Sequence, residues 1–142
     1  MPDNLYPDPT VSDASGYGFF NQPGASYNST RGAIEFDDAY TTDLVVTTGQ
    51  LAEDQFNAIP RYAIEVNVVD HQVGSNDVEV RIGNGPWVAL GINSDGWSSP
   101  VGLPVGVGPQ GLQGRPKTVT GTPPPCDLLI TDINIFAYPY PF

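Results

Sequence analysis

Hydrophobic and polar residues alternate most regularly in the middle of the chain. Within residues 62–70, Ile64, Val66 and Val68 alternate with polar or small residues, and residues 77–82 repeat the pattern. A period of two is typical of a β-strand with one face in the core and the other in water. Both segments are therefore predicted to be half-buried strands.

Turn-forming residues separate these strands from each other and from a third strand. Residues 71–76 are mostly polar and contain a glycine, which predicts a hairpin connection. The sequence Gly-Asn-Gly-Pro at 83–86 predicts a second turn before a strand at 87–92. Residues 62–92 are therefore expected to form a three-stranded antiparallel meander.

Weaker signals precede this meander. Residues 33–36 and the Thr- and Val-rich residues 40–48 are predicted strands. Residues 50–59 are the helix candidate, because three apolar side chains there can share one face. Pro60 limits that helix to two turns.

The last strand is predicted at residues 127–138, and its apolar phase changes near Thr131. Leu128 and Ile130 lie on one face, whereas Ile133 and Ile135 lie on the other. Either a β-bulge directs both halves into one core, or the strand is buried on both faces.

These elements predict an all-β fold, an antiparallel β-sandwich of jelly-roll-like form. Residues 33–138 are expected to form the sandwich, with an extended N-terminal arm at 1–32 and a C-terminal aromatic tail at 139–142. The 142-residue chain suits one such domain, because a β-sandwich needs about 100 residues.

Residues 96–125 are predicted to form a long Gly/Pro-rich loop. They contain no acidic residue, while Arg115 and Lys117 both lie in them. Three collagen-like triplets occupy residues 108–116, but a triple helix needs more repeats, and Lys117 stands where the next glycine is required. An extended arm or a covering loop is therefore expected, and loops of this length are usually functional.

Aromatic residues gather at both ends of the chain, where no helical or strand period is visible. Five of them lie in residues 1–32 and three in residues 138–142. Disordered tails are poor in aromatics because they have nothing to pack against, so these ends are expected to dock on a partner. The predicted partner contacts are Tyr6, Tyr17, Phe19, Phe20, Tyr27, Arg115, Lys117, Tyr140 and Phe142.

The chain carries sixteen acidic and five basic residues, a net charge of −11. That charge repels nucleic acids and anionic membranes, so neither is an expected partner. No apolar run is long enough to span a membrane, and the N-terminus lacks the basic start and apolar core of a signal peptide. We therefore expect a protein that is made and used without Sec export.

Residues for catalysis are few. His71 and Cys126 are the only histidine and cysteine, which excludes an intrachain disulfide and a metal cluster of the Cys/His type. His71 is expected in solvent at a hairpin tip, and Cys126 is expected in the core. We therefore predict a non-enzymatic protein without a cofactor.

Calcium is the most plausible ion for this composition. Asp37, Asp38 and Asp43, or alternatively residues 93–95, offer the oxygen ligands that calcium prefers. Exposed acids with roles in turns explain both groups without an ion, so no metal site is predicted.

The two tryptophans differ in their expected surroundings. Trp87 lies in a predicted strand and is expected in the core, whereas Trp97 follows a turn and is less constrained. An exposed Trp97 would offer a platform for stacking on a sugar ring. The alternative function is therefore a carbohydrate-binding module, or a minor tail or fibre protein that recognises host-surface glycans.

Residues 129–136, Leu-Ile-Thr-Asp-Ile-Asn-Ile-Phe, resemble the closing strand of galactose-binding-like jelly-roll domains, which often end in an apolar-Asp-apolar pattern. The likeness covers this one segment and implies only a fold. It carries no ligand residue over, because Thr-rich residues 40–48 stand where that family usually has an early strand with an aromatic platform.

The whole chain resembles small virion proteins of tailed bacteriophages, of the capsid decoration or minor capsid type. Such proteins are short, acidic, β-rich and cysteine-poor, with long arms. The resemblance implies a structural component of the virion, assembled in the host cytoplasm, that binds and stabilises the shell through its arms. Its implied partners are the major capsid protein or other virion subunits, together with further copies of this chain on the particle.

Overall fold

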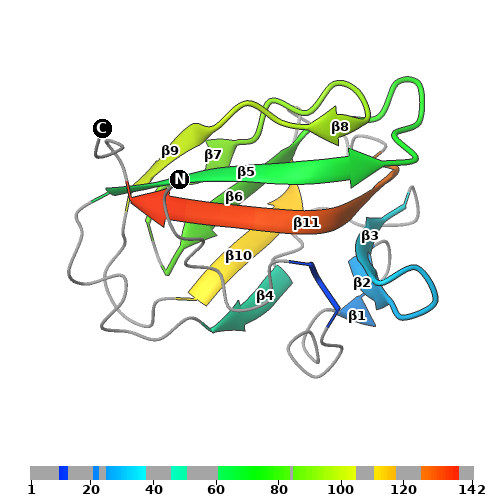
Figure 1. The fold of residues 1–142 in the computed structure, drawn as a ribbon, viewed down its shortest axis with the longest axis horizontal. Helices are drawn as coiled ribbons and strands as arrows, with labels where there is room; N and C mark the ends of the chain where they lie inside the picture. Colours follow the sequence, from blue (N-terminus) through cyan, green and yellow to red (C-terminus); the bar gives the residue numbers. More distant parts are fainter. Residues whose placement is uncertain are drawn as a thin grey trace.

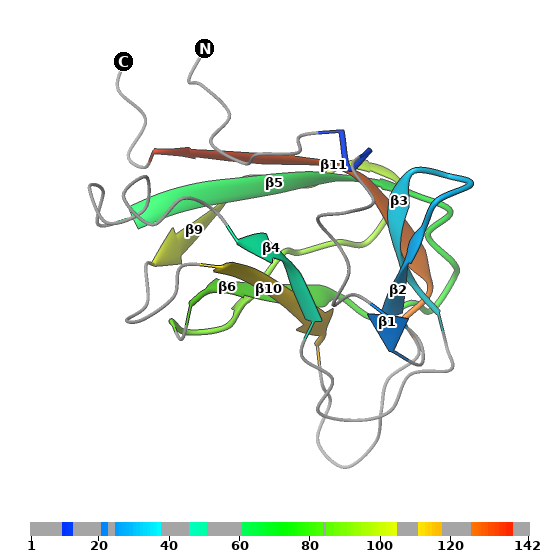
Figure 2. The same ribbon diagram turned by 90° about the horizontal axis from the view of Figure 1, so that it is seen from below.

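The structure, a computed structural model, describes residues 10–12, 21–22, 25–37, 46–50, 61–83, 85–104, 111–117 and 126–137. These residues form strands and turns but no helix, and the strands make two antiparallel sheets that lie face to face (Figure 1; Figure 2). The predicted all-β sandwich is therefore confirmed. The helix predicted at 50–59 falls outside the described residues, apart from Gln50, which ends a strand.

Seven strands form the first sheet. Their order across it is β1 (Asn21–Gln22), β2 (Ala25–Asn28), β3 (Ala33–Phe36), β11 (Leu128–Ala137), β5 (Arg61–Val69) and β8 (Gly96–Trp97). The seventh strand, β9 (Val101–Pro104), pairs with the opposite end of β5 from β8. The β5–β11 pair is the longest and spans the molecule (Figure 1).

Four strands form the second sheet, in the order β4 (Val46–Gln50), β10 (Gly111–Pro116), β6 (Val78–Ile82) and β7 (Val88–Ala89). Figure 2 shows β6 and β10 in the layer opposite β5 and β11. The strand predicted at 40–48 is seen at its end, where β4 begins at Val46, because residues 38–45 lie outside the described part.

The core lies between the two sheets and follows the predicted alternation. Ile64, Val66 and Val68 of β5 are buried, and so are Val78 and Val80 of β6. Each aliphatic side chain that is fully buried contributes about 1.5–3 kcal/mol relative to exposure. The two strands expected at 62–70 and 77–82 are therefore confirmed, together with the faces they bury.

A β-bulge in β11 resolves the phase change of the last strand. Ile130 pairs with Val68 and Asp132 pairs with Asn67, so Thr131 is an extra residue in β11. The bulge turns the strand by one residue, which is why Leu128 and Ile130 before it and Ile133 and Ile135 after it are all buried. The first of the two alternatives for this strand is confirmed.

The predicted meander is wrong at its first connection. β5 pairs with β11, β8 and β9, whereas β6 pairs with β10 and β7. Residues 70–77 therefore cross from one sheet to the other instead of closing a hairpin. The alternation of apolar and polar residues shows which face of a strand is buried. It does not show whether two such strands pair in one sheet or pack against each other from opposite sheets. The β6–β7 hairpin is present.

Three strands lie where a long loop was expected at residues 96–125. β8 and β9 flank β5, and β10 lies between β4 and β6, so the collagen-like residues 111–116 form an interior strand. Leu112, Gly114 and Pro116 are buried, while Gln113 and Arg115 are half-buried on the other face. The sequence shows no alternation of apolar and polar residues here, because a glycine and a proline occupy two of the three core positions. Pro116 is tolerated because β4 pairs with β10 only as far as Gly114, so Pro116 has a described neighbouring strand, β6, on one side only.

The N-terminal segment also contributes to the sheet. β2 pairs with β3 along its whole length, from Ala25 opposite Phe36 to Asn28 opposite Ala33. No strand period was visible in residues 1–32, because this strand is short and rich in polar residues. The part of the predicted arm at residues 25–28 therefore belongs to the sandwich.

Gly114→Ala is expected to raise the free energy of unfolding by about 0.4–1 kcal/mol, partly because alanine restricts the unfolded chain. The added Cβ would lie 3.8 Å from Val80 Cγ1, an ordinary contact, beside an apolar cavity of about 20 Å³ between the sheets. Urea denaturation followed by circular dichroism measures the change.

Gly74→Ala is the matched control. Nothing lies within 4 Å of its Cβ position, but its φ of +83° is unfavourable for any residue with a side chain. We expect this variant to lose about 1 kcal/mol or more. A loss of the same size in Gly114→Ala would contradict the placement of Gly114 in the core of the sandwich.

Candidate functional site

A tryptophan lies against two arginines on the outer face of the second sheet. Arg115 Cζ is 4.0 Å and Arg81 Cζ is 4.6 Å from the centre of the Trp87 ring. The residues next to each arginine in its strand, such as Val80 and Gly114, are buried in the core, so both arginines point away from it. These distances are those of cation–π interactions.

Hydrogen bonds across the sheet position both guanidinium groups. Arg115 Nε donates to Glu79 Oε1 at 2.5 Å, and Arg81 Nε donates to Gln113 Oε1 at 2.7 Å. Each acceptor lies directly opposite its arginine in the β6–β10 register. The residues Glu79, Arg81, Trp87, Gln113 and Arg115 are called the arginine–tryptophan cluster below.

The cluster is partly shielded from water, and its arginines have side-chain donors that no described residue uses. The side chains of Arg115 and Glu79 are 24% and 13% exposed. Of the side-chain donors of Arg81 and Arg115, only the two Nε atoms donate hydrogen bonds to described residues. The Nη groups can therefore donate to carboxylate or carbonyl oxygens of a partner.

The expectation that Trp87 packs in the core is wrong. β7 begins only at Val88, and the preceding Trp87 is half-buried against the arginines. A large flat ring next to two outward guanidinium groups gains packing area and cation–π attraction there without entering the core.

Lys117 lies just beyond the cluster, exposed after the end of β10. Its backbone is fixed on both sides, because its N–H donates to the Asp77 carbonyl at 2.8 Å and its carbonyl accepts from Asn76 Nδ2 at 2.9 Å. The structure therefore brings Arg115 and Lys117, two predicted partner contacts, to the same end of β10.

Tyr27 is the remaining predicted contact that the structure describes. It is half-buried against the core, and its hydroxyl donates to the Val11 carbonyl at 2.8 Å. Tyr27 thus packs on its own domain, which leaves its role toward a partner a prediction. The other predicted contacts lie outside the described residues: Tyr6, Tyr17, Phe19, Phe20, Tyr140 and Phe142.

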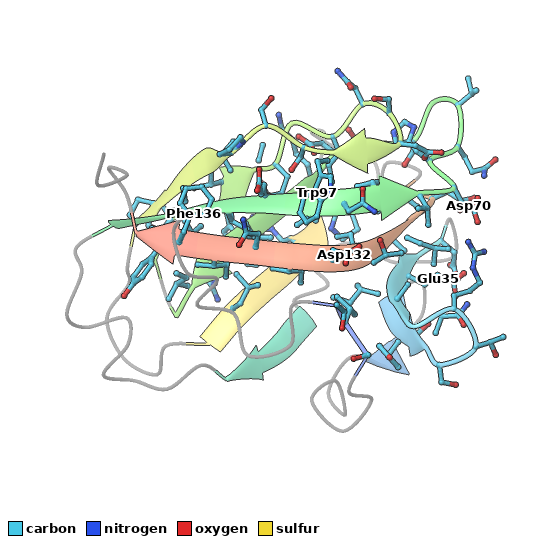
Figure 3. All side chains as sticks on the ribbon, in the orientation of Figure 1. Glu35, Asp70, Trp97, Asp132 and Phe136 are labelled. Carbon is cyan, nitrogen blue, oxygen red and sulfur yellow. The ribbon has the colours of Figure 1, made fainter. Side chains whose placement is uncertain are left out.

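A second tryptophan lies on the outer face of the first sheet. Trp97 of β8 is opposite Asn67 of β5, and Asn67 is opposite Asp132 of β11. Residues directly opposite in an antiparallel sheet share a face, so the three side chains make a row across three strands. Figure 3 shows the two outer members, Trp97 and Asp132. Trp97 forms the solvent-exposed end of this row, since it is 56% exposed.

Hydrogen bonds order the polar end of this row. Asn67 Nδ2 donates to Thr131 Oγ1 at 2.9 Å and to Asp132 Oδ2 at 3.3 Å. Thr131 Oγ1 donates to Asp132 Oδ2 at 2.8 Å. The bulge residue thus orients the carboxylate beside it. Trp97, Asn67, Thr131 and Asp132 are called the Trp97 row below.

A polar cavity of about 140 Å³ adjoins β8, and its lining includes Asn93, Ser94, Trp97 and Ser99. Ser98, the residue after Trp97, holds the backbone at β8 against β5. The Val66 N–H donates to Ser98 Oγ at 3.0 Å, and the Ser98 N–H donates to the Val66 carbonyl at 2.8 Å. The exposed Trp97 ring is therefore attached to an ordered backbone and lies next to a polar cavity.

His71 is less exposed than its predicted place at a hairpin tip implied. Its N–H donates to Asp95 Oδ1 at 2.8 Å, which ties the sheet-to-sheet connection to the turn before β8. The ring atom Nε2 is buried and has no hydrogen-bond partner in the described part of the chain. His71 itself is half-buried, whereas the next three residues of the connection, 72–74, are exposed.

Cys126 is buried, as predicted. Burial raises the pKa of its thiol to about 12, and the nearby acids Asp77 and Asp127 act in the same direction, while a hydrogen bond with Ser75 acts against it. At neutral pH the thiol is protonated, so it is poorly suited to nucleophilic attack.

The candidate calcium ligands are only partly described. Asp95 accepts the His71 N–H, and Asp38 and Asp43 lie outside the described part. Among the described residues, no three His, Cys, Asp or Glu side chains form a group that could hold a metal ion.

Comparisons with known proteins give no relative for this chain: no family model, no curated protein and no solved structure matches it. No helix of membrane-spanning length and hydropathy occurs among the described residues.

The native Cys126 thiol is expected to react with a disulfide reagent at pH 8 only after unfolding. Raising the pKa from 9 to about 12 lowers the thiolate fraction roughly a thousandfold, and the buried sulfur is also out of reach. Release of thionitrobenzoate in buffer and in urea measures both rates. Fast reaction in buffer would contradict the buried position.

Proposed function

We propose that this chain is a non-enzymatic structural component of a tailed-bacteriophage virion, a capsid decoration or minor capsid protein that docks on neighbouring subunits. The observation that carries the docking role is the arginine–tryptophan cluster on the outer face of the second sheet. The virion setting rests on the resemblance of the chain's overall make-up to such proteins.

The composition of the cluster suits a protein–protein contact. Tryptophan and arginine are the residue types most enriched among the side chains that dominate binding energy. Here Glu79 and Gln113 already hold both arginines, so binding would lose less side-chain entropy than it would with free arginines. The cluster is thus largely pre-organised.

The charge of the cluster indicates which chemical groups the partner surface carries. The chain carries only five bases, and Arg81, Arg115 and Lys117 are three of them. Glu79 offsets one charge, which leaves a cationic area on a protein of net charge −11. We propose that it meets carboxylates of the major capsid protein or of another virion subunit, and such complementarity fixes the orientation of the two surfaces.

Arg115→Ala is expected to reduce the number of copies per particle. The substitution removes a guanidinium donor and one contact of Trp87, and truncation of a residue that dominates an interface costs about 2 kcal/mol or more, roughly thirtyfold in affinity. The measurement is the molar ratio of this chain to the major capsid protein in purified particles of the phage that encodes it.

Arg31→Ala is the matched control, because Arg31 also forms an ion pair, with Asp70 at 2.7 Å, but lies outside the cluster. Its ratio is expected to equal that of the wild type. Absence of the wild-type chain from particles would refute the virion role, whereas full occupancy by Arg115→Ala would refute only the role of the cluster.

A further inference from the structure

The Trp97 row combines features that the docking proposal does not use. Trp97 is 56% exposed, and among the described residues the only other large hydrophobic side chain that is exposed is Val73. An exposed ring of this size is common at binding sites, where one face of a ligand can cover it.

The polar end of the row is ordered and still has acceptor capacity. Asp132 Oδ2 accepts from Thr131 and Asn67, while no described residue donates to Asp132 Oδ1 or to Asn67 Oδ1. Two fixed oxygens therefore lie on the same sheet face as the ring. They can accept hydrogen bonds from hydroxyl groups of a ligand that covers Trp97.

We infer that the Trp97 row is a carbohydrate-binding site for a neutral sugar. A pyranose ring has one face of C–H groups, which packs on an indole, and an edge of hydroxyl groups, which donate to carboxylate and amide oxygens. The row offers both in one plane, and the polar cavity beside β8 has room for hydroxyl groups or a neighbouring sugar unit.

The charge of the site selects among sugars. Asp132 lies in the row, and Glu65 is on the same face one pair further along β5, where Asn134 Nδ2 donates to its Oε1 at 2.8 Å. Two carboxylates repel uronic and sialic acids, so the expected ligand is a neutral hexose or a chain of such units. This inference does not depend on the docking proposal, because it concerns the other sheet.

A glycan array that carries neutral and acidic oligosaccharides tests the proposal with the full chain. We expect binding to neutral hexose-containing glycans only. Trp97→Ala should weaken binding by about tenfold or more, the scale of one lost aromatic contact. Asp132→Asn should also weaken it. Trp87→Ala is the matched control, since it removes the other tryptophan, and should bind as the wild type does.

Fluorescence titration gives an independent measurement. The chain has two tryptophans, so Trp87→Phe leaves Trp97 as the single reporter, and a neutral ligand from the array should change its emission. Circular dichroism confirms that each variant folds. Binding to no neutral glycan, binding unchanged in Trp97→Ala, or preference for acidic glycans would overturn the proposal. Loss of particle occupancy in Trp97→Ala without glycan binding would also overturn it, in favour of a protein contact.

Discussion

The pairing of β11 with β5 is the interaction on which the rest of the sandwich depends. β11 joins β3 on one side to β5 on the other, and its bulge at Thr131 keeps the apolar residues before and after it in one core. The same bulge sets Asp132 against Asn67 and lets Thr131 donate to the carboxylate. One extra residue thus serves both the core and the Trp97 row.

The local sequence pattern was a better predictor of residue burial than of strand pairing. The alternation in β5 and β6 correctly indicated their inner faces, and the phase change in β11 correctly indicated a bulge as one of two options. The pairing of β5 was misassigned because its partners, β11 above all, lie far away in sequence. The sequence neighbour β6 packs across the core instead.

Amino-acid composition predicted the wrong secondary structure in one segment, where backbone packing decides the structure. Residues 111–116 were expected in a loop because glycine and proline are rare in strands, yet Gly114 has its Cβ position facing Val80, where a small residue fits between the sheets. Neither tryptophan site follows from local pattern. The arginine–tryptophan cluster joins residues of β6 and β10 with Trp87, which precedes β7, and the Trp97 row joins residues of three strands. Both sites can therefore be found only once the strand register is known.

The two sites lie on opposite sides of the sandwich, and this separates their proposed roles. Arg81 and Arg115 alternate with buried residues of the second sheet and so point outward from it, whereas Asn67 and Asp132 point outward from the first. Figure 2 shows the two sheets as opposite layers. A partner that covers the arginine–tryptophan cluster therefore leaves the described part of the first sheet's outer face open. If the cluster anchors the chain on a shell, Trp97 faces away from that anchor, where a glycan can reach it. Docking and sugar binding are thus compatible in one small domain, because the core keeps the two faces apart.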